Sequence, residues 1–160
     1  MEEKPKKIFT KNQAYLKARN FCAYQERCQQ EIRDKLYYWG LHKEDVEALI
    51  AELVSENFIN EERYAKAFAG GKFRIKKWGK IKIEIELKKH NISEYCVRKG
   101  LEEVDDKEYL KFLKDIIGKK AKEYKAQNKF TKMKKIASYA ISRGYESELV
   151  WDIIKESFEN

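Results

Sequence analysis

One helical pattern is written three times along this chain. In each copy, two runs of apolar residues at helical spacing flank a turn residue, which is Gly40, then Asn91 and then Gly144. Asn91 follows Gly40 by 51 residues, and Gly144 follows Asn91 by 53. The apolar positions Ile32, Leu36, Leu41, Val46, Leu49, Ile50 and Leu53 recur as Ile83, Leu87, Ile92, Val97, Gly100, Leu101 and Val104, and again as Ile136, Ala140, Tyr145, Val150, Ile153, Ile154 and Ser157. A repeat of this period predicts stacked helical units.

Each copy predicts two amphipathic helices joined by a short bend. Gly and Asn suit the bend because they tolerate the left-handed conformation that ends a helix. Units of about 50 residues are marginally stable alone, so neighbouring units must share buried surface. The 160 residues include seven glycines and one proline, Pro5, so we expect no flexible linker between about residue 12 and the end. We therefore predict an all-α array.

Several classes of protein are disfavoured. No stretch approaches the roughly 18 uncharged apolar residues of a membrane span, and no signal peptide is recognisable, so we expect a cytoplasmic protein without membrane contact. Cys22, Cys28 and Cys96 lack close C-x-x-C spacing, which disfavours both a disulfide framework and a zinc site. Gly70-Gly71 lacks the lysine and spacing of a nucleotide-binding loop, and no nucleophile stands with a base. We expect neither enzymatic activity nor a cofactor or metal.

The net charge of +8 is distributed unevenly. Residues 72–89 carry eight Lys or Arg against two Glu, and residues 119–135 carry eight Lys against one Glu. Acidic residues dominate elsewhere, with seven acids against one Lys in 43–62, six against three basic residues in 94–108, and five against one in 146–160. Basic and acidic segments therefore alternate with the repeat.

Two helices around a glycine bend also resemble a helix-turn-helix, whose second helix enters the major groove of DNA. Here all three second helices, predicted at Lys43–Leu53, Ser93–Val104 and Glu146–Ser157, are acidic. The phosphate backbone would repel such helices. Sequence-specific reading of the groove is therefore disfavoured.

The basic segments are the candidate binding residues. Cations interleaved with a large aromatic ring suit a phosphate backbone with occasional base stacking. The first segment holds Lys72, Arg74, Lys76, Lys77, Trp78, Lys80 and Lys82. The second, which as one helix would span about 25 Å, holds Lys119, Lys120, Lys122, Lys125, Lys129, Lys132, Lys134 and Lys135. A solvated surface, or contact with an acidic protein, fits the same clusters.

Polar residues at helix starts have capping roles rather than catalytic ones. Asn60, Ser93 and Thr131 are predicted N-caps, and Asp105 or Asp106 is predicted to start the following helix.

The aromatic run Tyr37, Tyr38 and Trp39 beside the first turn allows two interpretations. Packing between units is the default, and contact with a partner is the alternative.

Residues of the first two units resemble a known family. The opening unit contributes Ala18-Arg19, Glu26-Arg27-Cys28, Glu31-Ile32, Leu36 and Gly40-Leu41, and the next contributes Phe58-Ile59-Asn60-Glu61-Glu62-Arg63-Tyr64-Ala65, Phe68, Lys72 to Lys77, Gly79, Ile83, Leu87 and Asn91-Ile92. Together they resemble the signature of RecX regulatory proteins, over about residues 12–158. The chain departs from the family pattern at Cys28, where a capping serine is usual, at Asn60, where an acid is usual, and at Asn91, where glycine is usual.

The resemblance implies three tandem three-helix units in an elongated, curved array, which we place at 12–62, 63–108 and 109–160 after a tail of residues 1–11. RecX-like proteins bind the RecA recombinase and its filaments on single-stranded DNA. They generally suppress ATP hydrolysis, strand exchange and the co-protease function of the DNA-damage response. Some bind DNA directly, so double-stranded DNA is a further candidate partner. We expect a monomer.

Two other functions stay open. The same lysines suit a stand-alone, nonspecific nucleic-acid-binding protein, or a scaffold that joins acidic partners through charge alone.

Overall fold

The chain folds into helices joined by short turns. The structure is a computed structural model that describes residues 8–125 and 128–159, so most of the predicted tail lies outside the described residues. The described part contains nine helices, which confirms the all-α class: α1 (Lys11–Tyr24), α2 (Gln29–Tyr38), α3 (Lys43–Ser55), α4 (Glu61–Lys76), α5 (Lys80–Lys89), α6 (Glu94–Leu101), α7 (Asp106–Glu123), α8 (Lys129–Ser142) and α9 (Ser147–Glu159).

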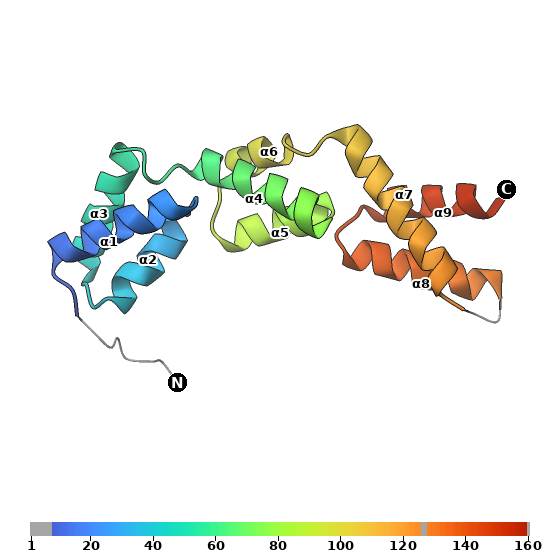
Figure 1. Cartoon of the computed structure of the whole chain (residues 1–160), viewed down its shortest axis with the longest axis horizontal. Coiled ribbons are helices and arrows are strands. Elements are labelled where there is room, and N and C mark those ends of the chain that lie inside the picture. The colour runs from blue at the N-terminus through green and yellow to red at the C-terminus, as the bar shows by residue number, and fades with distance from the viewer. Residues whose placement is uncertain (1–7, 126–127, 160) are drawn as a thin grey trace.

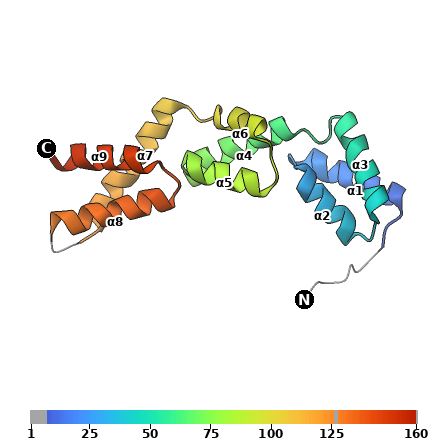
Figure 2. The same ribbon diagram turned by 180° about the vertical axis from the view of Figure 1, so that it is seen from behind.

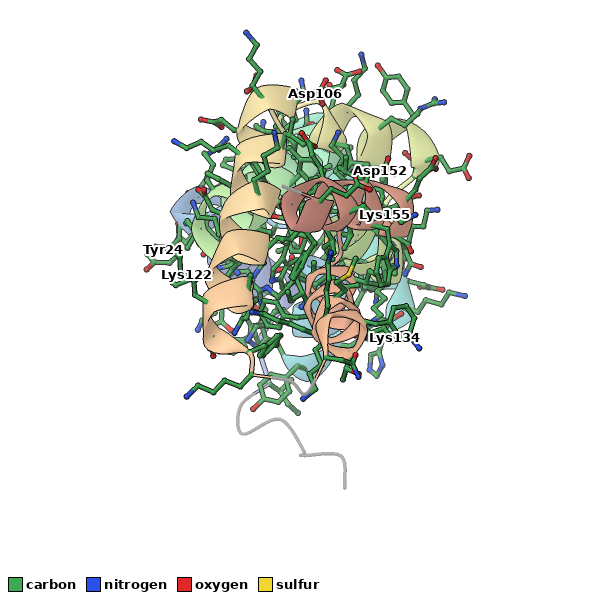
Figure 3. The ribbon with its side chains drawn as sticks, turned by 90° about the vertical axis from the view of Figure 1, so that its right-hand side faces the viewer. Tyr24, Asp106, Lys122, Lys134, Asp152 and Lys155 are labelled. Atoms are coloured by element: carbon green, nitrogen blue, oxygen red, sulfur yellow. The ribbon has the colours of Figure 1, made fainter. Side chains whose placement is uncertain are left out.

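The helices pack in three consecutive groups of three. The principal contacts join α1, α2 and α3 to one another, then α4, α5 and α6, then α7, α8 and α9. The groups follow one another in an elongated row (Figures 1 and 2), which Figure 3 shows from its C-terminal end. We call these groups the first, second and third units. The boundaries placed at residues 63 and 109 lie within the first turns of α4 and α7.

The three predicted turns adopt the left-handed conformation. The φ angles are 91° at Gly40, 59° at Asn91 and 101° at Gly144. Asn91 therefore replaces a glycine at a position whose backbone an asparagine tolerates. The repeated apolar positions are buried, except that Leu101 is half-buried and Ser157 is exposed.

Three of the four predicted N-caps are confirmed. Side-chain oxygens of Asn60, Ser93 and Asp105 accept hydrogen bonds from backbone N–H groups three residues on. The prediction for Thr131 was wrong, because α8 begins earlier: Asn128 is its N-cap and accepts from the Thr131 N–H at 2.8 Å. Cys28 starts α2 without a side-chain capping bond and is fully buried in the core.

Two glycine backbones bring the second and third units into direct contact. The Gly79 N–H donates to the Arg143 carbonyl at 2.9 Å, and the Ile81 N–H donates to the Gly144 carbonyl at 3.0 Å. A Cβ atom on Gly79 would lie 2.2 Å from the carbonyl carbon of Gly144, and one on Gly144 would lie 2.4 Å from the Lys82 Cβ. Only glycine at both positions allows the two backbone segments to approach this closely.

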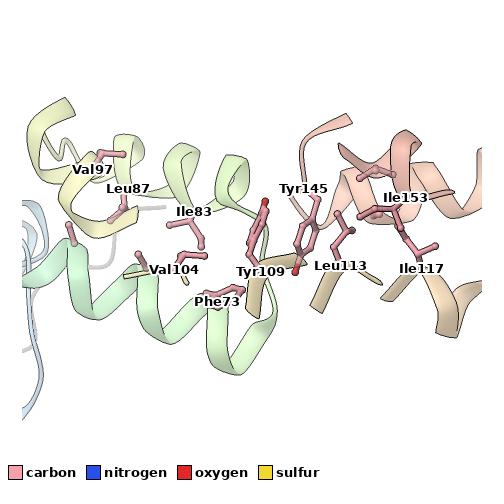
Figure 4. Packing of buried hydrophobic residues seen from close by; sticks show 14 of the residues in the cluster. Phe73, Ile83, Leu87, Val97, Val104, Tyr109, Leu113, Ile117, Tyr145 and Ile153 are labelled. Atoms are coloured by element: carbon pink, nitrogen blue, oxygen red, sulfur yellow. The ribbon is translucent and has the colours of Figure 1, made fainter. Parts of the chain in front are cut away.

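A continuous core crosses the same junction. Figure 4 shows Tyr109 and Tyr145 side by side between the apolar residues of the second and third units, and their ring centroids are 5.0 Å apart. The Phe73 ring of α4 lies 5.9 Å from the Tyr109 ring. Buried residues of the two units belong to one hydrophobic cluster, whereas the first unit has its own. The shared surface supplies burial that a small unit lacks alone.

The junction between the first and second units is more polar. The Arg63 guanidinium donates to the Glu26 carboxylate of the first unit and to the Asn57 carbonyl of the linker. The Gln29 N–H donates to the Glu61 carboxylate at 3.3 Å, and burial raises the pKa of that carboxyl. This junction therefore consists of side-chain bonds around one buried residue, Cys28, that joins the larger core.

The aromatic run near Gly40 does not pack between units, so the default interpretation was wrong. Trp39 packs within the first unit, where its ring meets that of Phe9 edge-on at 6.0 Å. Tyr37 and Tyr38 are 43% and 40% exposed. These two rings point away from the core because the apolar stripe of α2 already runs through Ile32 and Leu36.

The glycine junction predicts unequal effects of added methyl groups. We expect Gly79→Ala or Gly144→Ala to lower the free energy of unfolding by about 1–3 kcal/mol, because each Cβ would overlap the facing chain. Gly118→Ala is the control, since open space surrounds that helical position, and should raise stability by about 0.5–1 kcal/mol. Urea unfolding measures all three, and an unaltered midpoint for Gly79→Ala would contradict the close approach.

Candidate functional site

Two lysines and two aromatic rings from α4, α5 and the turn between them form a cluster that we call the Trp78 cluster. The ammonium nitrogens of Lys72 and Lys82 lie 4.9 and 4.4 Å from the Trp78 ring centroid. Phe68 meets Trp78 edge-on at 6.3 Å. Lysine over an aromatic face is attracted by the ring quadrupole. The structure thus brings together the tryptophan and two of the predicted cations.

The turn itself explains how these residues converge. Lys77 adopts a left-handed conformation, with φ 58°, and ends α4. Gly79 then caps α5, so the chain reverses within three residues. Lys72 near the end of α4 and Lys82 near the start of α5 therefore face the same ring.

Lys77 and Lys80 instead point to the junction with the third unit. The Lys77 ammonium lies 3.6 Å from the Phe112 ring centroid. Lys80 pairs with the Asp106 carboxylate at 3.2 Å and lies 4.8 Å from the Tyr109 ring centroid. These two predicted site residues contact the third unit, where Lys80 is half-buried and Lys77 stays exposed.

The remaining cations of the first segment lie at the exposed end of α4. Arg74 and Lys76 are both exposed. The Arg74 guanidinium covers the backbone of Gly70, where a Cβ atom would overlap it. The Lys76 carbonyl accepts a hydrogen bond from the Arg143 guanidinium, while its own ammonium is left for other contacts.

The second basic segment is not one helix, so its expected continuous span was wrong. α7 ends at Glu123, and α8 begins at Lys129. The two helices pack together, and an open surface pocket of about 500 Å³, which we call the Tyr139 pocket, lies along α8 beside the C-terminal end of α7. Its lining residues are Tyr124, Thr131, Lys134, Lys135, Ser138 and Tyr139.

Lys120 of α7 contacts two of the aromatic rings that line this pocket. Its ammonium lies 4.2 Å from the Tyr139 ring centroid and 5.5 Å from that of Tyr124. A hydrogen bond to Glu123 raises the pKa of Lys120, which stays a cation. The other predicted residues of this segment do not line the pocket: Lys119, Lys122 and Lys125 are exposed, and Lys132 is half-buried.

Sequence reasoning missed the aromatic partners. Phe68, Tyr124 and Tyr139 contact the predicted lysines, yet only Trp78 was identified beforehand. Tyr124 stands between lysines in the sequence, which was an available signal. Tyr139 is on a different helix from Lys120, so only the fold joins them.

Carboxylates border the Trp78 cluster on one side. A pocket of about 440 Å³ between the first and second units is lined by Lys72 and Phe68 together with Glu26 and Glu31. An anion is therefore favoured on the Trp78 side of Lys72. Within residues 8–125 and 128–159, no group of three or more His, Cys, Asp or Glu could hold a metal ion.

Comparison with known proteins identifies the family. Residues 14–53 match the family model of the first three-helix domain of RecX, and residues 60–101 match that of the second. The chain belongs to the RecX family. The two RecX matches together cover more than half of the 160 residues.

RecX relatives align over most of the chain. A "Regulatory protein RecX" of Clostridium acetobutylicum is 29% identical over 92% of this chain and 71% of its own length. One of Bacillus cereus is 25% identical over 89% of this chain, which spans only about half, 53%, of that relative. The crystal structure of RecX from Lactobacillus salivarius superposes with a TM-score of 0.81 at 24% identity, covering 91% of this chain and 95% of the other. The structural likeness establishes the fold.

No helix within the described residues of this RecX family member has the length and hydropathy to cross a membrane.

The tyrosines beside Lys77 and Lys80 predict a loss of stability at alkaline pH. The Tyr145 hydroxyl donates to the Lys77 carbonyl at 2.9 Å, and burial raises the pKa of Tyr145 to about 12. Because the unfolded chain loses this proton near pH 10, the folded state retains it longer, and stability falls as pH rises from about 10 to about 12.

Urea unfolding at a series of pH values tests this. The Tyr145 contribution has a slope of about 1.4 kcal/mol per pH unit, which Tyr145→Phe should remove. Tyr95→Phe is the control, because Tyr95 is 55% exposed. Equal slopes in the wild type and Tyr145→Phe would refute the assignment.

Proposed function

We propose that this RecX family protein binds RecA and its filaments on single-stranded DNA, and that it inhibits or modulates the recombinase, ATPase and co-protease activities. The observation that carries the proposal is the Trp78 cluster, in which two lysines flank one ring on the surface of the second unit. The Tyr139 pocket presents the same chemistry on the third unit. Membership of a family of regulatory proteins supports a role in regulation.

The distribution of charge supports a contact along the row of units. Lysines beside aromatic rings suit phosphates and stacked bases, as well as the acidic surface of a protein. The second and third units share one core and direct backbone bonds, so their two basic surfaces keep a fixed separation. A rigid pair of basic surfaces matches a repeating filament better than a single DNA site. Occupying the filament would cap its growth or block the groove where a second DNA enters.

RecA ATPase activity on single-stranded DNA, measured with and without stoichiometric protein, tests the proposal. We expect ATP hydrolysis and strand exchange to fall. If the rates of ATP hydrolysis and strand exchange were unchanged, the proposal would be refuted.

Salt separates this function from stand-alone DNA binding. About six phosphate contacts should weaken binding to free DNA about a thousandfold between roughly 50 and 200 mM salt. Inhibition of RecA that persists where binding to free DNA has vanished favours a direct contact with the filament. Inhibition that disappears together with DNA binding favours the nonspecific alternative.

The Trp78 cluster predicts the effect of neutralising its lysines. Lys72→Gln with Lys82→Gln should weaken binding to the filament by at least about tenfold and lower the salt slope of DNA binding by about 2, because two phosphate contacts are lost. Anisotropy titrations and the ATPase assay measure both effects.

The matched control removes the same charge elsewhere. The double variant Lys88→Gln with Lys99→Gln removes two cations that form surface ion pairs with Glu84 and Glu102. We expect this variant to bind almost as the wild type does, since exposed ion pairs contribute about 0–1 kcal/mol. If both double variants lost equal affinity, net charge rather than the Trp78 cluster would be responsible.

A further inference from the structure

A second kind of basic and aromatic site lies on the first unit, outside both basic segments. It is a pocket of about 480 Å³ formed by the C-terminal half of α1, the α1–α2 turn and the end of α2. Sites for small ligands have volumes of this order. We call it the Tyr24 pocket, and its lining residues are Lys17, Asn20, Phe21, Tyr24, Arg27 and Trp39.

The cations of the Tyr24 pocket differ in availability. Arg27 is fixed, because its guanidinium lies 3.6 Å from the Phe21 ring centroid and pairs with Glu31 at 3.6 Å. Lys17 is exposed, and its ammonium lies 4.7 Å from the Phe9 ring centroid and 5.6 Å from that of Trp39. No described carboxylate pairs with it, in contrast to Arg27. Lys17 is therefore the cation best placed to meet an incoming anion.

Tyr24 supplies an unused aromatic surface. It is the last residue of α1 and is 84% exposed, more than any other large apolar side chain in the described part of the chain. A single exposed ring is ordinary, but this one lines a pocket with two cations. Asn20 adds an exposed amide, which can both donate to and accept from the edge of a base.

The lining favours an anion with a planar apolar part. No described carboxylate lines the Tyr24 pocket, whereas Glu31 and Asp34 line the neighbouring pocket on the other side of Phe21. An acidic peptide would satisfy the cations but leave the exposed ring without a flat partner. A nucleotide offers both a phosphate for Lys17 and a base for Tyr24.

We propose that the Tyr24 pocket binds a nucleotide unit of single-stranded nucleic acid, with the base stacked on Tyr24 and the phosphate beside Lys17. This deepens the proposed function, since it extends contact with the strand to the first unit. In Figure 3, Tyr24 and Lys122 of α7 project to the same side of the long axis. A strand along that face would meet the first and third units.

The test compares oligonucleotides with and without bases. Fluorescence anisotropy gives the affinity for an oligothymidylate of about 20 nucleotides and for an abasic phosphodiester of equal length, each labelled identically. Tyr24→Ala should bind the oligothymidylate roughly tenfold more weakly and the abasic strand unchanged, as expected for one lost stacking contact. Tyr24→Phe keeps a ring and should bind as the wild type does.

Tyr95→Ala is the matched control. Tyr95 is an exposed tyrosine on the second unit with the Lys99 ammonium 5.6 Å from its ring centroid, and it lies outside the Tyr24 pocket. It should leave both affinities unchanged. Circular dichroism verifies that each variant is folded.

Three outcomes overturn the assignment: no binding of the oligothymidylate by the wild type, equal affinities of Tyr24→Ala and the wild type for it, or equal losses on both strands. Polyglutamate is a further probe, and a loss of its binding in Tyr24→Ala as large as that of the oligothymidylate would identify an acidic-protein site instead.

The RecA ATPase assay separates this inference from the proposed function. If the wild type inhibits RecA and Tyr24→Ala binds the oligothymidylate normally, only the Tyr24 assignment fails. If Tyr24→Ala loses base-dependent binding while the wild type leaves RecA unaffected, the pocket stands and the proposed function fails.

Discussion

The contact between two glycine backbones fixes how the second and third units lie against each other. Gly79 and Gly144 allow the chains to exchange hydrogen bonds directly, which side chains at either position would prevent. Tyr109 and Tyr145 then join the two cores, and their hydroxyls bond the segment that carries Lys77 and Lys80. The same contact therefore determines which way the cations of this segment face. Lys72 and Lys82 face Trp78 on the second unit, whereas Lys77 and Lys80 face Phe112, Tyr109 and Asp106 of the third.

Much of the fold could be predicted from the sequence, because the apolar residues that a helix buries recur at the helical period. The stripe of Ile32, Leu36 and their repeats predicted both the helices and the turns, and the turn at Asn91 could be identified despite its departure from glycine. The N-cap of α8 could not be predicted in the same way, because two nearby polar residues suit that position. Asn128 and Thr131 both suit an N-cap, and a single sequence does not reveal which one the chain uses.

The candidate site was predictable only as a distribution of charge. Consecutive lysines showed where cations gather, but their orientation depends on which rings the fold brings near. Lys120 meets Tyr139 from another helix, and no local pattern encodes that pair. The Tyr24 pocket escaped detection for a related reason. Its cations, Lys17 and Arg27, are separated in the sequence and come together only where α1 turns into α2.

The lysines that rest on aromatic rings have a consequence for how fast a ligand exchanges. A free lysine side chain loses up to about 2 kcal/mol of rotamer entropy when it is immobilised. Lys72 and Lys82 are already restrained by Trp78, so part of that loss precedes binding. When a phosphate binds, each lysine exchanges its weak attraction to the Trp78 ring for a contact with the phosphate. When the phosphate leaves, the lysine returns to the ring. Cations restrained in this way favour rapid exchange of an anionic ligand over long residence.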